Sequence, residues 1–319
     1  MFVSLEIVIP VFLVILSGYV AGKRHWVSSS ALKGLSFFVY YLAIPALLFR
    51  TMAQGNLSSD IDFSLIIAFY SVSLTIFICS AFLGRFLYGH GLKEAAVMAM
   101  GATYGNLLLL GFPLVYSAFG DEGMVPLTML IAFQAPILMA LTSMLTEYDL
   151  SREGNGGQGV KAIMLSLAKA IWSNPIILGL IAGGIFQLSS FEFIAILDRF
   201  TSILSGAVVP CALFSLGVSL TEFKLAGDLK QSFLIVIVKT IIYPSIVAFL
   251  VFNVIEVPPL WAAVAVILAA QPTGMNVFIL AQQYGVFTAR AASVVLSSTI
   301  LSVVTVTLLI AYYVNVLPK

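Results

Sequence analysis

The sequence predicts an all-α membrane protein with ten transmembrane helices, built as two inverted five-helix repeats in which helices 4 and 9 are broken and cross. The composition is the first reason: 61% of the 319 residues are hydrophobic and 9% are charged, whereas soluble domains carry about 25% charged residues. The second reason is a series of ten apolar stretches along the chain. The third is that glycine, proline and polar residues interrupt the fourth and ninth stretches.

Each apolar stretch is close to the length that crosses a bilayer, about 20 residues in a helix. The loops between the stretches are short, and no soluble domain is inserted. We therefore expect membrane-spanning helices at residues 3–22, 34–53, 63–84, 95–119, 126–147, 168–189, 200–220, 231–253, 260–283 and 289–314.

A hydrophilic linker at 149–164 divides the chain into a first repeat, 1–148, and a second repeat, 165–319. Its glycine-rich part, Ser151–Gly159, indicates a flexible connection. Five spans is an odd number, so the two repeats cross the membrane in opposite directions. This arrangement is the inverted repeat of many secondary transporters, with its pseudo-two-fold axis in the membrane plane.

The basic residues predict the direction of the spans, because cytoplasmic loops carry an excess of lysine and arginine. Three of them, Arg50, Arg199 and Lys319, fall on the outer side, and Lys239 falls inside a span. Both termini are then expected outside the cell membrane, inner or plasma, with the 149–164 linker in the cytoplasm. The remaining eleven of the 15 basic residues fall on the cytoplasmic side: Lys23, Arg24, Lys33, Arg85, Lys93, Arg152, Lys161, Lys169, Lys224, Lys230 and Arg290.

The fourth stretch is broken between Gly105 and Pro113, and the ninth between Gln271 and Asn276. Proline and glycine stop a helix, and backbone groups freed in the hydrocarbon layer need partners from the protein or from a cavity. Interrupted helices in corresponding positions of two repeats are the best sequence indication of a transporter's binding site. We therefore predict a secondary transporter, or a facilitated carrier, whose site lies where the two breaks meet.

Motifs in four of the spans resemble the auxin efflux carrier family. Asn106, Gly111 and Pro113 match the element N-x-x-x-x-G-x-P, and the residues from Pro272 to Tyr284 match the pattern P-x-G followed by A-x-x-Y. Further matches are Phe119-Gly120, Asn174-Pro175 and Phe214 to Gly217.

The resemblance implies ten helices in an inverted repeat, with spans 4 and 9 crossing at their breaks as in bile-acid-type transporters. It also implies a scaffold domain and a transport domain that move against each other. Known substrates of the family are organic anions such as auxins and dicarboxylates. Because the chain lacks the long cytoplasmic loop of many plant auxin exporters, it is most similar to the compact, bacterial-type permeases.

Gly105 and Asn106 stand at the first break, where a second half-helix begins. An asparagine amide offers two donors and an acceptor, and the start of a helix presents free N–H groups and a positive dipole end. Together these groups suit a carboxylate, which can bind and also leave because no fixed counter-charge holds it. Asn106 could instead cap the broken helix, and the two roles are compatible.

The second break and two further polar residues complete the predicted site. Gln271 and Asn276 could line the site or cap the interrupted helix, and Gln134 could line the cavity or serve helix packing. Lys239 could attract an anion or pair with a carbonyl, or its stem could extend to the cytoplasmic interface. The predicted substrate-binding residues are Asn106, Gly105, Gln271, Thr273, Gly274, Asn276, Gln134 and Lys239, while Gly111, Pro113 and Pro272 shape the backbone at the breaks.

Patterns that the sequence lacks argue against other functions. The two histidines, His25 and His90, fall in loops, and there is no Ser–His dyad, pair of membrane aspartates or H-E-x-x-H motif. An intramembrane enzyme, a metal site and a haem or other cofactor are therefore not expected. No basic tract suited to nucleic acid is present. A non-transporting receptor or a channel is the remaining alternative.

No span carries a central aspartate or glutamate, the residue types that proton-coupled carriers use as a relay. The coupling ion, H+ or Na+, is therefore left open, as are uniport and a homodimer. The predicted function is the movement of a small organic anion, a carboxylate, across the lipid bilayer by alternating access.

Overall fold

The computed structural model describes four ranges of the chain: residues 2–54, 63–152, 174–189 and 191–317. Within them the protein is helical and has no strand, apart from an antiparallel bridge between Gly105 and Thr273. Each of the ten predicted ranges contains helix. Helix extends into the predicted linker as far as Arg152, and the rest of the glycine-rich part lies outside the described residues.

Helices of the first half follow the predicted ranges closely, and several are divided by a short π-helical or 3₁₀ segment. Their bounds are α1 Phe2–Lys23, α2 Ser29–Phe38, η1 Val39–Ala43, α3 Ile44–Gln54, α4 Ser64–Phe86, α5 Leu92–Thr103, η2 Leu107–Gly111, α6 Phe112–Phe119, η3 Gly120–Gly123, α7 Met124–Gln134, η4 Ala135–Met139 and α8 Ala140–Arg152.

The second half is built in the same way. Its helices are α10 Pro175–Leu188, α11 Ala195–Gly206, α12 Val208–Leu220, α13 Leu229–Ile237, η5 Val238–Ile242, α14 Tyr243–Asn253, α15 Pro259–Ala269, α16 Asn276–Tyr284 and α17 Thr288–Val316.

Six helices of the described residues are long and apolar enough to cross a membrane. Three shorter apolar helices are Val8–Lys23, Pro175–Leu188 and Pro259–Ala269. Large apolar side chains are exposed on many of the helices, which is expected where lipid, not water, covers the surface. The six long helices run over residues 29–54, 64–86, 107–152, 195–220, 229–253 and 288–316.

Prolines explain most of the π-helical turns. Pro45, Pro113 and Pro244 each stand two residues after the last residue of a π turn, namely η1, η2 and η5. A proline ring clashes with the carbonyl four residues earlier and offers no N–H to it. The turn therefore widens to the π form, which is a common cause of kinks and of reoriented side chains.

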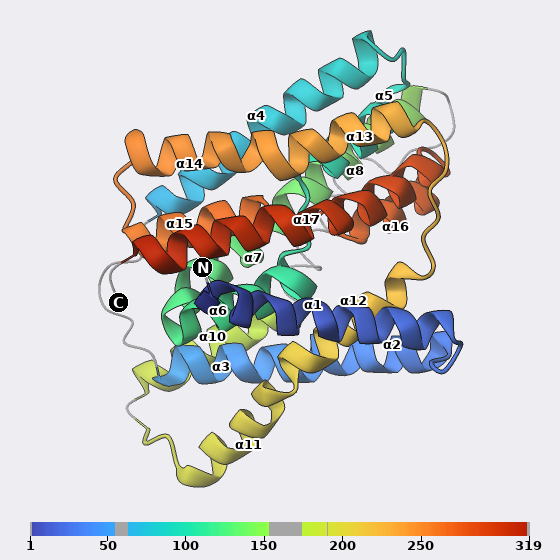
Figure 1. The fold of residues 1–319 in the computed structure, drawn as a ribbon. Helices are drawn as coiled ribbons and strands as arrows, with labels where there is room; N and C mark the ends of the chain where they lie inside the picture. The colour runs from blue at the N-terminus through green and yellow to red at the C-terminus, as the bar shows by residue number, and fades with distance from the viewer. Residues whose placement is uncertain (1, 55–62, 153–173, 190, 318–319) are drawn as a thin grey trace.

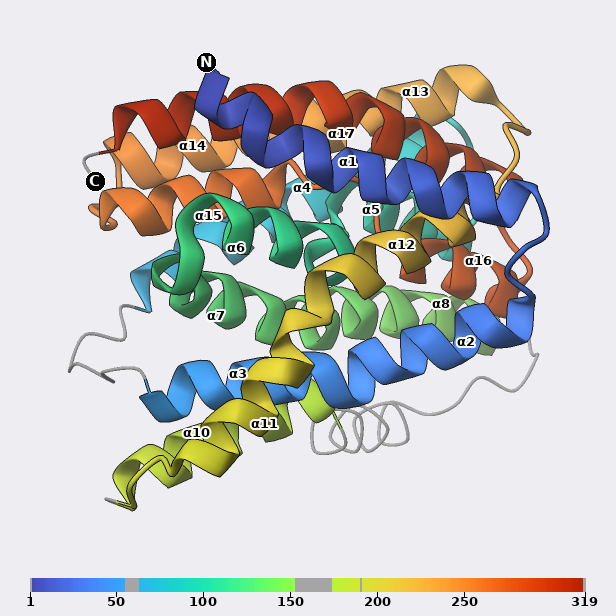
Figure 2. The same ribbon diagram turned by 60° about the horizontal axis from the view of Figure 1, so that its bottom comes forward.

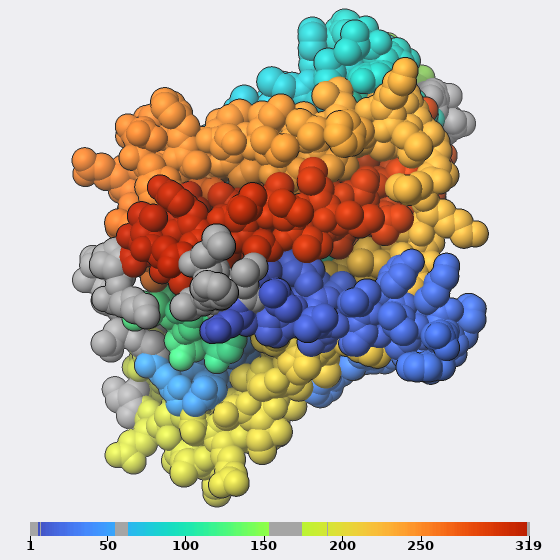
Figure 3. All heavy atoms as spheres, viewed as in Figure 1, coloured from blue at the N-terminus to red at the C-terminus, as the bar shows by residue number. Residues whose placement is uncertain are grey.

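The helices form two groups (Figures 1 and 2). The first group contains α1, α2, α3, α10, α11 and α12, and the second contains α4, α5, α7, α8 and α13 to α17. The start of α1 and the end of α17 lie toward the same end of the bundle (Figure 1). On one face α17 and α1 run side by side where the two groups meet (Figure 3).

Close backbone contacts at glycines hold the first group together. A Cβ atom built at Gly217 of α12 would lie 2.0 Å from the Ile15 carbonyl oxygen, and one at Gly18 of α1 would lie 2.2 Å from that of Phe214. Gly183 of α10 also lies close to α3, where a Cβ would be 2.6 Å from a backbone oxygen. Small residues let helices approach in lipid, where packing replaces the hydrophobic effect as the driving force.

Candidate functional site

The two interruptions contact each other through their backbones. The N–H of Asn106 donates to the carbonyl of Pro272 at 2.7 Å, and the N–H of Gly274 donates to the carbonyl of Tyr104 at 2.9 Å. These two bonds pair the extended segments antiparallel between α5 and η2 on one side and α15 and α16 on the other. The pairing satisfies backbone groups that neither helix can satisfy, which is the condition for irregular backbone inside a membrane protein.

Gln134 holds the first interruption from the side. Its side-chain oxygen accepts from the Gly105 N–H at 3.0 Å, and its side-chain nitrogen donates to the Gly105 carbonyl at 2.9 Å. An amide offers one acceptor and two donors, so this reciprocal pair uses both sides of the peptide group. Gln134 therefore links α7 to the first interruption.

Lys239 is fully buried beside the crossing, with 0% of its surface exposed. Its Nζ donates to the carbonyl of Ala269, at the end of α15, over 2.6 Å and lies 4.8 Å from the ring centre of Tyr243. A Cβ atom built at Gly105 would lie 3.4 Å from the same Nζ. The side chain therefore does not extend to the interface. Its amino group pairs with a backbone carbonyl, which is one of the roles considered for it from the sequence.

Thr273 and Gln271 are buried within the second interruption. Thr273 Oγ1 donates to the carbonyl of Gly101 at 2.8 Å, and its N–H donates to Ser298 Oγ at 3.0 Å. Gln271 Nε2 donates to the carbonyl of Ile267 at 3.1 Å, while its Oε1 has no hydrogen-bond partner within the described ranges. Both side chains thus fix the backbone next to Pro272.

Asn106 and Asn276 begin the two half-helices that follow the interruptions. Asn106 is 7% exposed, and its Oδ1 accepts from the N–H of Leu109 at 3.3 Å, so the predicted capping role is present. Asn276 is partly exposed, and its Nδ2 donates to the hydroxyl of Tyr104 at 2.7 Å. Tyr104 therefore links the second half-helix to the first interruption.

Two glycines at the breaks allow close approach. A Cβ atom at Gly111 would lie 2.9 Å from Leu268 Cδ2 of α15, and one at Gly274 would lie 2.9 Å from the ring of Tyr104. Pro113 is the second residue of α6 and follows the widened turn η2. That Gly111, Pro113 and Pro272 shape the backbone for transport stays a prediction.

A cavity of about 510 Å³ lies beside the crossing, between α2, α12 and α16. Leu109 and Met275, each close to one interruption, line it together with polar residues. Ser29, Lys33, Ser36 and Tyr40 are three to four positions apart on α2 and η1, which places them on one helix face. The polar lining residues are Ser29, Lys33, Ser36, Tyr40, Tyr41, Ser215, Ser219, Glu222 and Gln282.

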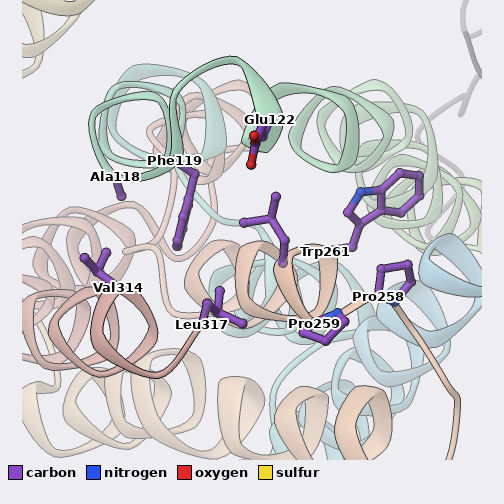
Figure 4. A pocket seen from close by; sticks show the side chains of 9 residues that line it. Ala118, Phe119, Glu122, Pro258, Pro259, Trp261, Val314 and Leu317 are labelled. Carbon is purple, nitrogen blue, oxygen red and sulfur yellow. The ribbon is translucent and has the colours of Figure 1, made fainter. Parts of the chain in front are cut away.

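A second cavity, of about 690 Å³, lies away from the crossing, at the start of α15 and the end of α17 (Figure 4). Trp261, Phe119 and Leu317 line it, and Glu122 is its acidic residue. None of the predicted site residues lines either cavity. The 690 Å³ cavity has a carboxylate and no basic residue in its lining, so it suits an anion less well than the cavity beside the crossing, where Lys33 accompanies Glu222.

Sequence reasoning missed Tyr104, Tyr40 and Ser215. The signal for Tyr40 is the polar stripe that begins at Ser29 and continues at helical spacing through an apolar helix. Tyr104 directly precedes the predicted break, but a tyrosine in an apolar span usually indicates packing or an interfacial position.

Comparison with known proteins assigns the family. The sequence pattern of the family described as "Membrane transport protein" matches residues 3–310. The chain belongs to this family. The expected resemblance to auxin efflux carriers is thereby confirmed, and so are a multi-pass membrane protein and a transporter rather than an enzyme.

Relatives of the transporter agree with this assignment. It is 30% identical over 308 residues to a protein of Rhizobium meliloti named "Putative malonate transporter", which covers 94% of this chain and 93% of that protein. An uncharacterized transporter of Methanocaldococcus jannaschii is 26% identical over 317 residues, 96% of this chain and 97% of the relative. The mouse lysosomal cholesterol signaling protein is 26% identical over 215 residues, 66% of this chain and 25% of that protein.

Proposed function

We propose that this transporter carries a small organic anion, a carboxylate, and binds it at the crossing of the two interruptions. The charges around the crossing carry this proposal. Within the described residues Lys239 is the one buried lysine or arginine, and no aspartate or glutamate is buried. A buried lysine without a carboxylate partner favours an anionic ligand, because an anion would stabilise the charged form of its amino group. The relative named as a malonate transporter supports a carboxylate.

The start of η2 supports the same site. Its first N–H groups lack partners within the helix, and the positive end of the helix dipole lies there. Asn106 Oδ1 already caps this helix, and its Nδ2 makes no hydrogen bond to the described residues, so a donor is left for a carboxylate oxygen. Capping and substrate contact are thus compatible in one side chain.

Alternating access fits the division into two helix groups. The cavity beside the crossing is bounded by α2 and α12 of the first group and by α16 of the second. We infer that residues 1–148 and 165–319 are inverted repeats, whose symmetry provides two related conformations. Displacement of the second group along the first would move the crossing as one hydrogen-bonded unit. The site would then be open first to one side of the membrane and afterwards to the other.

Binding of malonate to variants of Asn106 tests the site. Asn106→Ala removes a hydrogen bond to a charged group and should weaken binding by roughly 1.5–3 kcal/mol, and Asn106→Asp should weaken it further by charge repulsion. Isothermal titration of the purified protein measures both. Asn253→Asp is the control, because Asn253 is exposed at the end of α14 and bonds only within its own helix. An Asn106→Asp protein that binds malonate like the parent would place the site elsewhere.

Flux in liposomes separates a carrier from a channel or a receptor. A carrier should show saturable uptake of labelled malonate that accelerates when unlabelled malonate is present on the opposite side. A channel would show neither saturation nor trans-stimulation, and a receptor would show binding without flux. Repeating the experiment with and without Na+, and with and without a pH gradient, identifies the coupling ion.

A further inference from the structure

Ser215 differs from the other hydroxyl residues of its span that are not exposed. Thr201, Ser205 and Ser219 each donate to a backbone carbonyl three or four residues earlier, over 2.6–2.8 Å. This bond is the usual arrangement for serine and threonine inside a helix. Ser215 is 1% exposed, and its Oγ has no hydrogen-bond partner within the described residues. Buried polar groups are nearly always paired, so this one requires an explanation.

The position of Ser215 indicates a ligand. Ser215 lines the 510 Å³ cavity together with Leu109 and Met275, which stand next to the two interruptions. Its helix, α12, packs against η2, the helical turn that begins after Asn106. The unpaired hydroxyl therefore lies in the part of the cavity wall that α12 forms, beside η2.

We propose that the Ser215 hydroxyl is a substrate-binding group, which donates a hydrogen bond to a carboxylate oxygen of the transported anion. The inference rests on the proposed function, and it adds a binding residue from the first group of helices. A serine hydroxyl can donate one proton, and an ionised carboxylate is an acceptor that forms stronger hydrogen bonds than a neutral group does.

A bound anion would then lie between α12 and the crossing. η2, whose Leu109 lines the cavity, would face the anion from one side, and α12 would hold it from the other. Binding would be strongest only when η2 lies against α12, as it does here. Movement of the crossing away from α12 would remove the Ser215 hydrogen bond and so favour release on the other side.

Malonate titration into purified variants tests the role of the hydroxyl. Ser215→Ala should weaken binding about 10- to 100-fold, the range expected for a lost hydrogen bond to a charged group. Ser215→Thr, which keeps the hydroxyl, should stay within about threefold of the parent. Ser302→Ala is the matched control, because Ser302 is equally buried but lies outside the cavity lining, and its hydroxyl donates to the Thr299 carbonyl at 2.8 Å.

Cysteine protection provides a readout that a purely structural role would not change. Ser215→Cys is placed in a background in which Cys79 and Cys211 are replaced by alanine, and labelling with a charged methanethiosulfonate reagent is followed over time. We expect malonate to slow this labelling at least fivefold, while sulfate at the same ionic strength does not. A thiol that is labelled equally fast with and without malonate would overturn the inference.

Failure of this inference is distinguishable from failure of the proposed function. If the parent protein binds neither malonate nor any other small carboxylate, both are overturned. If the parent binds malonate and Ser215→Ala binds it equally well, only the role of Ser215 is overturned. The same holds if Ser215→Thr loses affinity as strongly as Ser215→Ala does, since the hydroxyl would then not be the group that matters.

Discussion

Replacing Gln134 by methionine should destabilise the crossing more than almost any other single polar change. Gln134 supplies both partners of the Gly105 peptide group, at 3.0 and 2.9 Å. Methionine has a similar volume but leaves one buried N–H and one buried carbonyl without partners, at about 1–3 kcal/mol each. The expected loss is therefore about 2–6 kcal/mol, which lowers the melting temperature by roughly 4–12 °C for a chain of this size.

Thermal unfolding of the detergent-purified protein measures this loss. Gln54→Met is the control: Gln54 is exposed and bonds to Asp198 on the surface, so the change should cost less than about 0.5 kcal/mol. Gln134→Glu should be at least as damaging as methionine, because an ionised carboxylate cannot donate to the Gly105 carbonyl. If Gln134→Met melts within 1 °C of the parent, as the control is expected to, the reciprocal pair does not hold the crossing and the reasoning is refuted.

Three further predictions follow from charge, packing and topology. Lys239→Met should weaken malonate binding at least tenfold in titration, because it removes the buried amino group that would pair with the anion; unchanged affinity would contradict the proposed electrostatics. Gly183→Ala should lower stability by about 1–3 kcal/mol through overpacking against α3, whereas Gly184→Ala, with open space around it, should be neutral or stabilising by up to about 1 kcal/mol; equal melting temperatures would contradict the packing argument. A cysteine in place of Asp121, which is exposed between α6 and α7, should react with an external thiol reagent, and one at Gly156 should not; the reverse pattern would invert the predicted orientation.

The helix pattern was largely predictable from the sequence because an apolar stretch of sufficient length has few alternatives in a bilayer. The interruptions were also predictable, since Gly105 and Pro272 are incompatible with continuous helix. Their mutual hydrogen bonds agree with the expected meeting of the breaks. The inverted repeat and the orientation stay predictions.

Side-chain roles at the site were only partly predictable. From the sequence, Lys239 could have reached either the interface or the crossing. It lies in the widened turn before Pro244, and such a turn changes the direction of a side chain in a way that the spacing of residues does not reveal. Asn106 was assigned two compatible roles, of which capping is present and substrate contact stays a prediction. Ser215 could not be identified at all, because nothing in the sequence separates it from Ser219, which bonds to its own helix.

The widened turns also set the rotational phase of each helix. A regular α-helix advances about 100° per residue, and η5 accommodates its extra residue before Pro244 continues the helix. Because the π turn absorbs this residue, the segments before and after it keep nearly the relative rotation of a regular helix that is one residue shorter. Deleting one residue from this turn would therefore change the faces that α13 and α14 present only slightly, whereas deleting one residue from the regular part of α14 would rotate everything beyond it by about 100°. We expect the deletion in the turn to be the better tolerated of the two, with its cost falling on Lys239, which lies within the turn.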